Sequence, residues 1–544
     1  MASPGVAIAA LLCVVIAAPL LALLGFLGQP TEGLWAHLAS TVLPEYARNS
    51  ALLCLGVGLG ALVVGTGTGW LVAMYRFPGQ RALSWALVLP LAMPAYVLAY
   101  AYTDFLQVTG PVQTLIRSAT GWGWRDYWFP NVRSLGGAIF VLAAALYPYV
   151  YVLARAAFAE QSTCALEVSR TLGCTQFAMF RRVALPLARP IIAAGVAFVM
   201  METLADFGAV AYFELRTFTT GIYRAWYALG SPAAAAQLAS LLLLLVGVLV
   251  AVEWSARGRG RVSTATTRLF REQRIELRGW HGWLACGACT LPVLLGFVLP
   301  AVVLAAMALN AADGVGPARL ARLAGNTMLL GMLASLVIVG TAVAGLIAAS
   351  RERSRIGGGL LQAAALGYAV PGAVVGVGVL LVIGNFDRTV DALARGFGSG
   401  GTGLVLGGTI GALLYAYLVR FFAVGFNPLQ AGMARIPPVL RDAARVLGCR
   451  PSEVAARVVL PLLRPSLLSG ALLVLVDVMK ELPATLILRP FNFDTLAVEA
   501  FQLATTERLA GAAMPSLVIV AAGLVPVVLL CRMLDRRRGL AAVP

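Results

Sequence analysis

Two strongly apolar stretches of the chain each contain a pair of carboxylates. Glu202 and Asp206 form the first pair, and Asp477 and Glu481 form the second, at a constant offset of 275 in residue number. Within each pair the spacing is i,i+4, so a continuous helix would carry both carboxylates on one face. A charge at the centre of a bilayer costs about 2.5–3.5 kcal/mol on insertion scales, so we expect these groups to face a cavity or a partner.

Four carboxylates suit a hard, highly charged cation, because such ions prefer oxygen ligands. The chain has only two histidines, and its eight cysteines are scattered, which disfavours zinc, copper and nickel. One interpretation is a translocation path in which Glu202, Asp206, Asp477 and Glu481 bind a cation transiently. The other is an ion pair within the protein, for which Lys480, the only lysine, is the candidate partner.

The elements that must position these carboxylates are membrane helices. Of the 544 residues, 60% are hydrophobic and 12% are charged, whereas a soluble globular chain has about 45–50% and about 25%. This composition excludes a soluble enzyme with a single core. A spanning helix needs about 20 apolar residues, and we therefore predict an all-α membrane protein with about 12 transmembrane helices in two groups of six. The apolar runs lie near residues 5–27, 50–74, 82–104, 136–157, 190–212, 232–254, 284–309, 326–350, 360–384, 403–424, 466–488 and 512–531.

The distribution of arginine predicts the orientation of these helices. With both termini in the cytoplasm, the inner segments contain 28 arginines and the outer segments contain 12, as the positive-inside rule requires. The inner count includes Arg420, which we place at the cytoplasmic end of the predicted span 403–424. The net charge of +17 thus indicates a lipid bilayer and no nucleic acid. The first run has no basic segment before it, so we expect a retained helix rather than a signal peptide.

A repeated motif divides the chain into two similar halves. We place the first half at residues 1–256, a basic cytoplasmic linker at 257–282 and the second half at 283–544. The two copies of the motif occupy residues 167–186 and 442–461 and align without a gap at the offset of 275. Each copy predicts a short helix, a glycine turn, a second short helix and a proline at the entry to the next span. The matching positions are Glu167, Gly173, Leu185 and Pro186 in the first copy, and Asp442, Gly448, Leu460 and Pro461 in the second.

Both copies resemble the cytoplasmic coupling motif of bacterial ABC importer permeases. In that family the short helix docks into a groove on a separate ATPase subunit, so the resemblance implies coupling roles for the eight matching residues. The first copy departs from the family pattern, since Val168 and Ser169 replace two alanines. The chain itself has no P-loop, because its only lysine is followed by Glu481 and not by Ser or Thr.

The resemblance has further implications for partners and location. Two copies in one chain are similar to fused permeases of the type I importer fold, which supply both membrane halves themselves. We therefore expect no enzymatic activity and no permanently bound cofactor, with ATP and Mg bound by two copies of a cytoplasmic ATPase subunit. A periplasmic substrate-binding protein is also implied, and the location is the bacterial inner membrane.

Four shorter runs are similar to those of ferric-iron ABC importer permeases. This similarity implies Fe3+ as the transported substrate, with Glu202, Asp206, Asp477 and Glu481 as its transient ligands. Import of thiamine or a phosphonate by the same fold is the alternative, although a phosphonate would favour cationic walls and thiamine would also require aromatic stacking. An ion-coupled secondary transporter and a membrane scaffold are further alternatives. The four runs are residues 201–208, 220–226, 480–485 and 488–496.

Overall fold

The computed structural model describes residues 4–30, 33–159, 161, 169, 171, 173–258, 275–310, 314–351, 355–398 and 401–540. Within these residues, eleven helices are long and apolar enough to span a membrane. The number rises to twelve if the bent pair formed by Gln80–Ala92 and Ala95–Thr120 is one span. The predicted all-α membrane fold is confirmed.

The described residues form two compact units that do not coincide with the two halves of the sequence. Each unit takes elements from both halves, which the hydrophobic pattern did not predict. The sequence boundaries at 256 and 283 concern the repeat rather than the packing, and they stay a prediction. Unit 1 contains residues 1–42, 218–243 and 315–502, and unit 2 contains residues 43–217, 244–314 and 503–544.

In unit 1 the helices α16, α19 and α22 pack against one another. A Cβ atom on Gly470 of α22 would lie 3.1 Å from the carbonyl oxygen of Gly425 in α19, so small residues let the two backbones approach closely. Helix α1 covers α16, α17 and α18, and the Tyr415 hydroxyl donates to the Val15 carbonyl. The elements are α1 (Pro4–Gly25), α2 (Leu34–Thr41), α12 (Phe218–Tyr227), the first part of α13 (Pro232–Gly258), α16 (Pro317–Arg351), α17 (Arg355–Ala364), η4 (Ala365–Ala369), α18 (Gly372–Gly396), α19 (Ile410–Ala434), α20 (Pro438–Val446), α21 (Pro451–Val454), η5 (Ala455–Val459), α22 (Leu460–Met479), α23 (Pro483–Leu488) and most of α24 (Leu496–Thr505).

In unit 2 the helices α3, α7 and α10 form the corresponding core. A Cβ atom on Gly65 of α3 would lie 2.8 Å from the amide nitrogen of Tyr151 in α7, so this packing also needs a glycine. The elements are α3 (Leu43–Met74), β1 (Tyr75–Arg76), α4 (Gln80–Ala86), η1 (Leu89–Ala92), α5 (Ala95–Leu106), α6 (Pro111–Thr120), α7 (Leu135–Ala159), α9 (Gln176–Met179), η2 (Phe180–Ala184), α10 (Leu185–Ala205), α11 (Gly208–Tyr212), the rest of α13, β2 (Ile275–Glu276), α14 (Trp280–Val293), η3 (Leu294–Val298), α15 (Leu299–Leu309) and α25 (Leu509–Leu540). Strands β1 and β2 pair in parallel, with Tyr75 opposite Ile275.

Several predicted spans are broken helices. Helix α10 ends at Ala205 and α22 ends at Met479, and the short helices α11 and α23 follow them. The third span bends by 94° next to Pro94, because proline excludes helical backbone at the residue before it. Met93 is accordingly extended, with φ −106° and ψ 114°.

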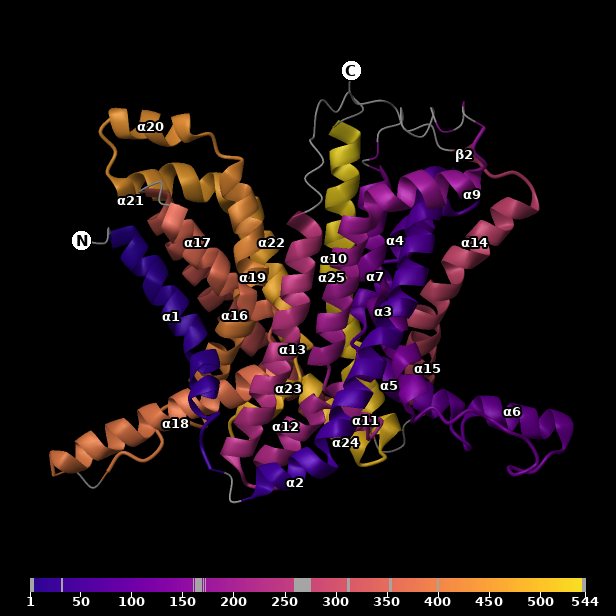
Figure 1. Cartoon of the computed structure of the whole chain (residues 1–544), viewed down its shortest axis with the longest axis horizontal. Helices are drawn as coiled ribbons and strands as arrows, with labels where there is room; N and C mark the ends of the chain where they lie inside the picture. The colour runs from indigo at the N-terminus through magenta and orange to yellow at the C-terminus, as the bar shows by residue number, and fades with distance from the viewer. Residues whose placement is uncertain are drawn as a thin grey trace. The chain divides into compact units, whose positions relative to one another are not determined.

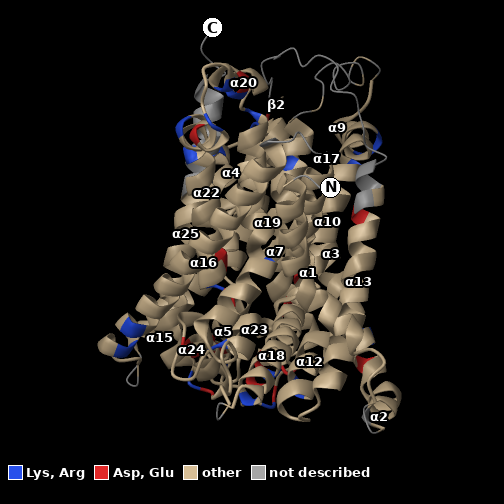
Figure 2. Ribbon diagram, turned by 90° about the vertical axis from the view of Figure 1, so that its left-hand side faces the viewer, with Lys and Arg blue, Asp and Glu red and all other residues tan. Residues whose placement is uncertain are grey.

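Within each unit the repeat motif and the short helix after the break lie at opposite ends of the bundle. In unit 1, α20 and α21 lie at one end, and α12 and α23 lie at the other (Figure 1). In unit 2, α9 lies at the end opposite α11 (Figure 1). In the ribbon of Figure 2, basic residues are grouped near α20, whereas the long helices contain few charged residues along their length.

Candidate functional site

The repeat motif of unit 1 forms a helical hairpin, in which a glycine turn joins α20 to α21. Helix α20 is followed by Gly448, whose φ of 85° is available mainly to glycine. The Gly448 amide donates to the Arg445 carbonyl at 3.0 Å, and the Cys449 amide donates to the Ala444 carbonyl at 3.1 Å. These two bonds satisfy carbonyl groups at the end of the helix, as in a glycine C-cap.

The first copy repeats this turn at the same spacing. Gly173 has a φ of 78°, and the Cys174 amide donates to the Ser169 carbonyl at 3.0 Å. Glu167 and the other residues of the predicted first helix, apart from Ser169 and Thr171, lie outside the described residues. The glycine turn is therefore common to both copies.

Each copy then enters its span through a single π-helical turn. The Leu185 amide donates to the Phe180 carbonyl and the Leu460 amide donates to the Ala455 carbonyl, so both bonds are of the i to i−5 kind. Pro186 and Pro461 follow directly and have no N–H to donate. Residues 176–205 and 451–479 are thus continuous helical runs, so the predicted second short helix is the first part of the span.

The outer face of α20 presents apolar side chains to solvent. Val446 and Val439 of the helix are 88% and 72% exposed, and Leu447, the residue directly after the helix, is 83% exposed. Three buried residues anchor the base of the hairpin, namely Ile436, Val459 and Leu463. Exposed apolar side chains on a fixed support are typical of a protein docking site. A small pocket beside them is lined by Ile347, Ser350, Arg441, Asp442, Arg445, Pro451, Val454, Ala455 and Val459.

Two of the predicted site carboxylates cap the short helices that follow the breaks. Asp206 Oδ1 accepts hydrogen bonds from the amides of Ala209 and Val210 at 3.1 and 3.2 Å, at the start of α11. In unit 1, Glu481 accepts from the corresponding two amides at the start of α23, both at 2.9 Å. Carboxylates are favourable partners for the unpaired amides of a helix N-terminus.

The prediction that each carboxylate pair shares one helix face is therefore wrong. Glu202 lies within α10, but Asp206 follows the end of that helix. Asp477 lies within α22, but Glu481 follows its end. The side chains of Asp206 and Glu481 accept hydrogen bonds from backbone amides of the next helix. Such side-chain bonds compete with the helical backbone pattern, and α10 and α22 therefore end before the predicted ends of their spans.

The carboxylate of Glu481 is buried and paired. Its side chain is 1% exposed, and Oε1 lies 3.5 Å from Nη1 of Arg420, a residue of α19 that is 12% exposed. Oε2 also accepts from the Thr485 hydroxyl at 2.5 Å, and that hydroxyl lies 2.7 Å from the Tyr417 hydroxyl. A Cβ atom on Gly372 would lie 2.7 Å from Glu481 Oε1, so only glycine leaves room for this cluster.

Sequence reasoning missed Arg420 as a site residue, because it was counted at the cytoplasmic end of its span. The structure places it in the interior of helix α19, where it is largely buried. The signal was present, since Arg420 is a charged residue inside an apolar run and such residues are rarely without a function.

The two helical carboxylates have different surroundings. Asp477 Oδ1 lies 2.8 Å from Lys480 Nζ, with exposed fractions of 19% and 30% for the two side chains. Glu202 is partly exposed. No hydrogen bond or ion pair joins Glu202 to another of the described residues. Within the same residues, no group of three or more His, Cys, Asp and Glu side chains could hold a metal ion.

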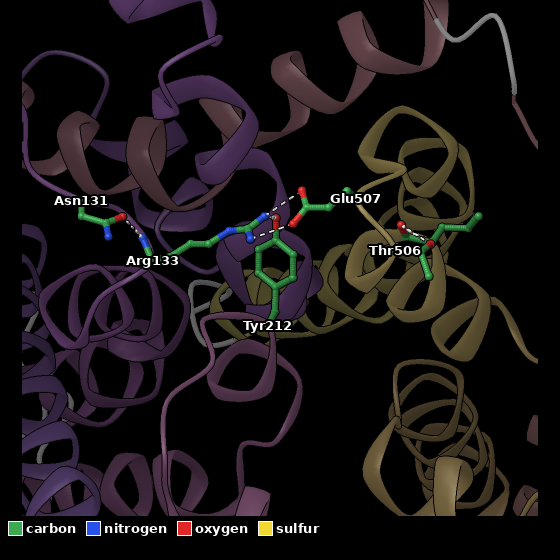
Figure 3. A network of polar contacts seen from close by, with 6 residues as sticks. Asn131, Arg133, Tyr212, Thr506 and Glu507 are labelled. Carbon is green, nitrogen blue, oxygen red and sulfur yellow. Dashed lines mark hydrogen bonds and ion pairs between the residues drawn. The ribbon is translucent and has the colours of Figure 1, made fainter. Parts of the chain in front are cut away.

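A polar network secures the end of α11 in unit 2. Arg133 Nη1 and Nη2 lie 2.8 and 3.1 Å from the two carboxylate oxygens of Glu507, and Nη2 donates to the Tyr212 hydroxyl at 3.2 Å (Figure 3). The Arg133 guanidinium holds the pKa of Glu507 below its usual range. Glu507 has a φ of 61°. Since Arg133 and Glu507 are 374 residues apart, no local sequence signal could have paired them.

The loop after each short helix is held by an asparagine. Asn49 of α3 donates to the Arg216 carbonyl at 3.0 Å in unit 2. Asn326 of α16 donates to the Asp494 carbonyl, also at 3.0 Å, in unit 1. The breaks, the caps and the loops are therefore built in the same way in both units.

Comparison with known proteins agrees with this internal duplication. The family described as "Binding-protein-dependent transport system inner membrane component" matches the chain twice, at residues 65–259 and 340–539. The Fe(3+)-transport system permease protein FbpB 2 of Haemophilus influenzae is 23% identical over 490 residues, which is 89% of each chain.

Other relatives transport different substrates according to their names. The molybdenum transport system permease protein ModB of Escherichia coli is 28% identical over 229 residues, covering 39% of this chain and 94% of its own. The sulfate transport system permease protein CysT of Salmonella typhimurium is 28% identical over 209 residues, covering 37% of this chain and 70% of its own.

Family membership carries several general conclusions. The chain is an inner-membrane transport subunit, and its partners are a substrate-binding protein and an ATPase. The two matches indicate a fused permease with two copies of the membrane domain. The chain belongs to the family of inner-membrane components of binding-protein-dependent transport systems, the permeases of ABC importers.

Proposed function

We propose that this permease imports ferric iron from a periplasmic binding protein into the cytoplasm by alternating access. ATP hydrolysis takes place on two copies of a separate ATPase subunit, and both termini of the permease are cytoplasmic. The observation that carries the choice of cargo is the similarity to an Fe(3+)-transport permease over 89% of the chain. Carboxylates at matching positions of the two units support it, because Fe3+ prefers oxygen ligands.

The coupling surface in this proposal is the exposed face of α20 with the equivalent segment of the first copy. Val439, Val446 and Leu447 would enter a groove on the ATPase, while Gly448 and Gly173 fix the turns behind the helices. The π-helical turns before Pro186 and Pro461 join each motif to its span without a flexible loop. Movement at the motif is then transmitted along α10 and α22. Leu185 and Leu460 begin these helices, Asp442 lines the adjoining pocket, and Glu167 completes the first motif.

The proposed path uses the carboxylates unequally. Glu202 and Asp477 lie on the long helices and are partly exposed, so they are the first ligands for a passing ion. Asp206 and Glu481 hold the short helices in place and meet the ion only when those helices move. Ligands that bind in turn can release the ion, whereas a closed site with four fixed carboxylates would retain it.

A second candidate cargo is an oxyanion such as a phosphonate. The buried guanidinium of Arg420 favours it, because arginine binds phosphate-like groups in two-point geometry. A putative 2-aminoethylphosphonate permease of Salmonella typhimurium is 32% identical over 153 residues, but this covers only 28% of the present chain. Arg420 is already paired with Glu481, so we retain iron as the main proposal.

The test is uptake of radioactive ferric iron by iron-starved cells with and without the gene for this chain. We expect energy-dependent uptake to disappear with the gene and to return with the wild type but not with Glu202→Ala. A matched control is Glu276→Ala, which changes a carboxylate that is 58% exposed and lies outside the proposed path and both copies of the motif. Unchanged iron uptake together with lost phosphonate uptake would replace iron by the oxyanion.

A further inference from the structure

Helix α6 and the loop that follows it extend sideways from the bundle of unit 2. We call residues 111–134 the arm. In Figure 1, α6 points away from α3 and α7, at the end of the bundle opposite α9. The 94° bend next to Pro94 gives the chain this direction, because α5 and α6 follow the bend. Helix α6 buries a single residue, Gln113, so most of its surface is turned away from the rest of unit 2.

Polar side chains of the arm bond to one another and to nearby backbone. Gln113 Nε2 donates to the Leu106 carbonyl at 2.8 Å, and Gln113 Oε1 accepts from the Tyr127 hydroxyl, also at 2.8 Å. The Gly123 amide donates to Asp126 Oδ2 at 2.7 Å, and Asp126 is the only carboxylate in the sequence of the arm. These bonds hold the loop against α6 and give the arm a defined shape.

Large apolar side chains of the arm point outward instead. Trp128 is 85% exposed, Trp124 is 60% exposed, and Leu115 of α6 is exposed as well. Three of the ten tryptophans of the chain lie in this loop, at positions 122, 124 and 128. Exposed apolar patches mark contacts with proteins or membranes, and tryptophan is enriched where a membrane meets water. The composition of the arm therefore favours a lipid interface.

A cation accompanies these exposed rings. The Arg125 guanidinium lies 4.3 Å from the ring centroid of Trp124, and Arg125 is itself exposed. Arginine keeps its charged group in a polar layer while its stem covers apolar surface, and its guanidinium matches the geometry of a phosphate. This pair is therefore suited to the phosphate layer of a phospholipid membrane.

The arm leaves the bundle beside a lipid-facing surface. Helix α5, which leads into the arm, packs against α15. Helix α15 belongs to the candidate span Trp280–Leu309, and its side chains Val302 and Leu309 are exposed. Apolar side chains on the outer face of a spanning helix are in contact with the acyl chains of the bilayer. The outward face of the arm is thus continuous with a surface that lipid covers.

Unit 1 has an arm of the same kind, formed by the second half of α18 and the loop after it. Beyond Asp387, α18 buries none of its residues, and in Figure 1 it leaves the bundle at the end opposite α20. The Asp387 carboxylate is buried and accepts from the amides of Leu406 and Gly407 at 2.9 and 2.8 Å. Phe397 and Leu404 are exposed. Again a polar group is turned inward and apolar groups are turned outward.

We propose that the arm of unit 2 lies in the headgroup region of the bilayer. The rings of Trp124 and Trp128 contact the upper acyl chains, and Arg125 binds lipid phosphates. The leaflet is the one opposite the coupling motifs, which is the periplasmic leaflet if α20 docks on a cytoplasmic ATPase, whereas contact with lipid does not depend on the cargo. Because α5 leads into the arm and also packs against α11, this contact restrains the helix next to the break in unit 2.

The test is the fluorescence of Trp128 in phospholipid nanodiscs that contain the permease and its ATPase. The emission of this residue is the difference between the spectra of the wild type and Trp128→Phe. We expect lipids brominated high on the acyl chain to quench it by at least half, and lipids brominated at the chain end to quench it less. Iodide in the buffer should quench it far less than it quenches N-acetyltryptophanamide in the same suspension.

The matched control is Trp70→Phe in the same unit. Trp70 is buried, and its ring packs against those of Phe158 and Phe180. Its difference emission should respond weakly to both quenchers, which separates a ring enclosed by protein from a ring surrounded by lipid. Trp124→Phe repeats the measurement on a second ring of the arm and should give the same response as Trp128→Phe.

The inference is overturned if iodide quenches Trp128 as strongly as N-acetyltryptophanamide and brominated lipids have no effect, because the arm then lies in water. If the loaded binding protein protects Trp128 from iodide in that case, the arm is a docking surface for this protein. Uptake of radioactive iron into proteoliposomes of the same lipids tests the proposed function separately. Quenching by brominated lipids without iron uptake would keep the membrane contact and remove the proposed cargo.

Discussion

Asp206 and Glu481, which occupy matching positions of the sequence repeat, accept hydrogen bonds from amides that also occupy matching positions. Asp206 binds the amides of Ala209 and Val210, and Glu481 binds those of Ala484 and Thr485. The shared offset shows that the helix break belongs to the duplicated unit. Asp206 and Glu481 therefore stabilise the start of a short helix in both halves, apart from any contact with the transported ion.

Replacement of Gly372 by alanine should destabilise unit 1. The new Cβ atom would meet Arg420, Glu481 and Pro483, and all three are held by their neighbours. Overpacking of this kind costs about 1–3 kcal/mol. Thermal unfolding in detergent measures the effect, and Gly384→Ala in the same helix is the control because its Cβ atom would meet nothing within 4 Å. Equal melting temperatures for the two variants would contradict the packing described for Gly372.

The Arg420–Glu481 pair should show strong coupling in a double-mutant cycle. Arg420→Met alone leaves a buried carboxylate without its cation, at a cost of about 3–5 kcal/mol. Glu481→Gln in the same chain removes the remaining charge, so the double variant should recover a large part of the stability. Unfolding free energies of the wild type, the two single variants and the double variant give the coupling. Additive losses would mean that the two side chains do not interact.

Stability near the Arg133–Glu507 pair should depend on pH in the acid range. The pKa of Glu507 is lowered by Arg133, so the folded pKa lies below the unfolded value of about 4.3. The stabilisation is therefore present above that value and is lost as the pH falls through the folded pKa. Melting temperatures of the wild type and Glu507→Gln should differ near neutral pH and converge in acid. A difference that stays constant with pH would show that the charge of Glu507 is not involved.

Changes on the exposed face of α20 should reduce coupling to the ATPase without reducing the stability of the fold. Val446→Ser and Leu447→Ser together change side chains that are 88% and 83% exposed, so folding should be nearly unaffected. We expect a loss of at least tenfold in the ATPase stimulation produced by the loaded binding protein. Leu309→Ser is the control, since this leucine is 88% exposed but lies at the end of α15. Full stimulation in the α20 variant would assign docking to another surface.

The all-α membrane fold could be predicted from the sequence because long apolar runs have few other solutions. The limits of the helices at Ala205 and Met479 could not, because hydropathy is the same on both sides of each break and a carboxylate cap decides where the helix ends. The hydrophobic pattern also could not predict that each unit contains segments from both halves of the sequence. An apolar helix such as α1 does not specify in its sequence which helices it covers.

The candidate site was predicted in part. The acidic positions were found from their type and offset. Lys480 was predicted as an ion-pair partner without a choice among the four carboxylates, and the structure pairs it with Asp477. Arg420 and Glu481 belong to separate spans of the sequence, and the contact of Tyr100 with Tyr212 likewise joins two separate helices. Such contacts depend on how the helices pack, which a single sequence does not state.

The most direct test of iron import is ATP-driven uptake of radioactive ferric iron into proteoliposomes that contain the permease, its ATPase and the iron-loaded binding protein. The account predicts accumulation that requires ATP and that falls at least tenfold in Glu202→Gln, while ATPase stimulation by the binding protein persists. Stimulated ATP hydrolysis without any iron accumulation in the wild type would contradict it and would identify a permease for another cargo.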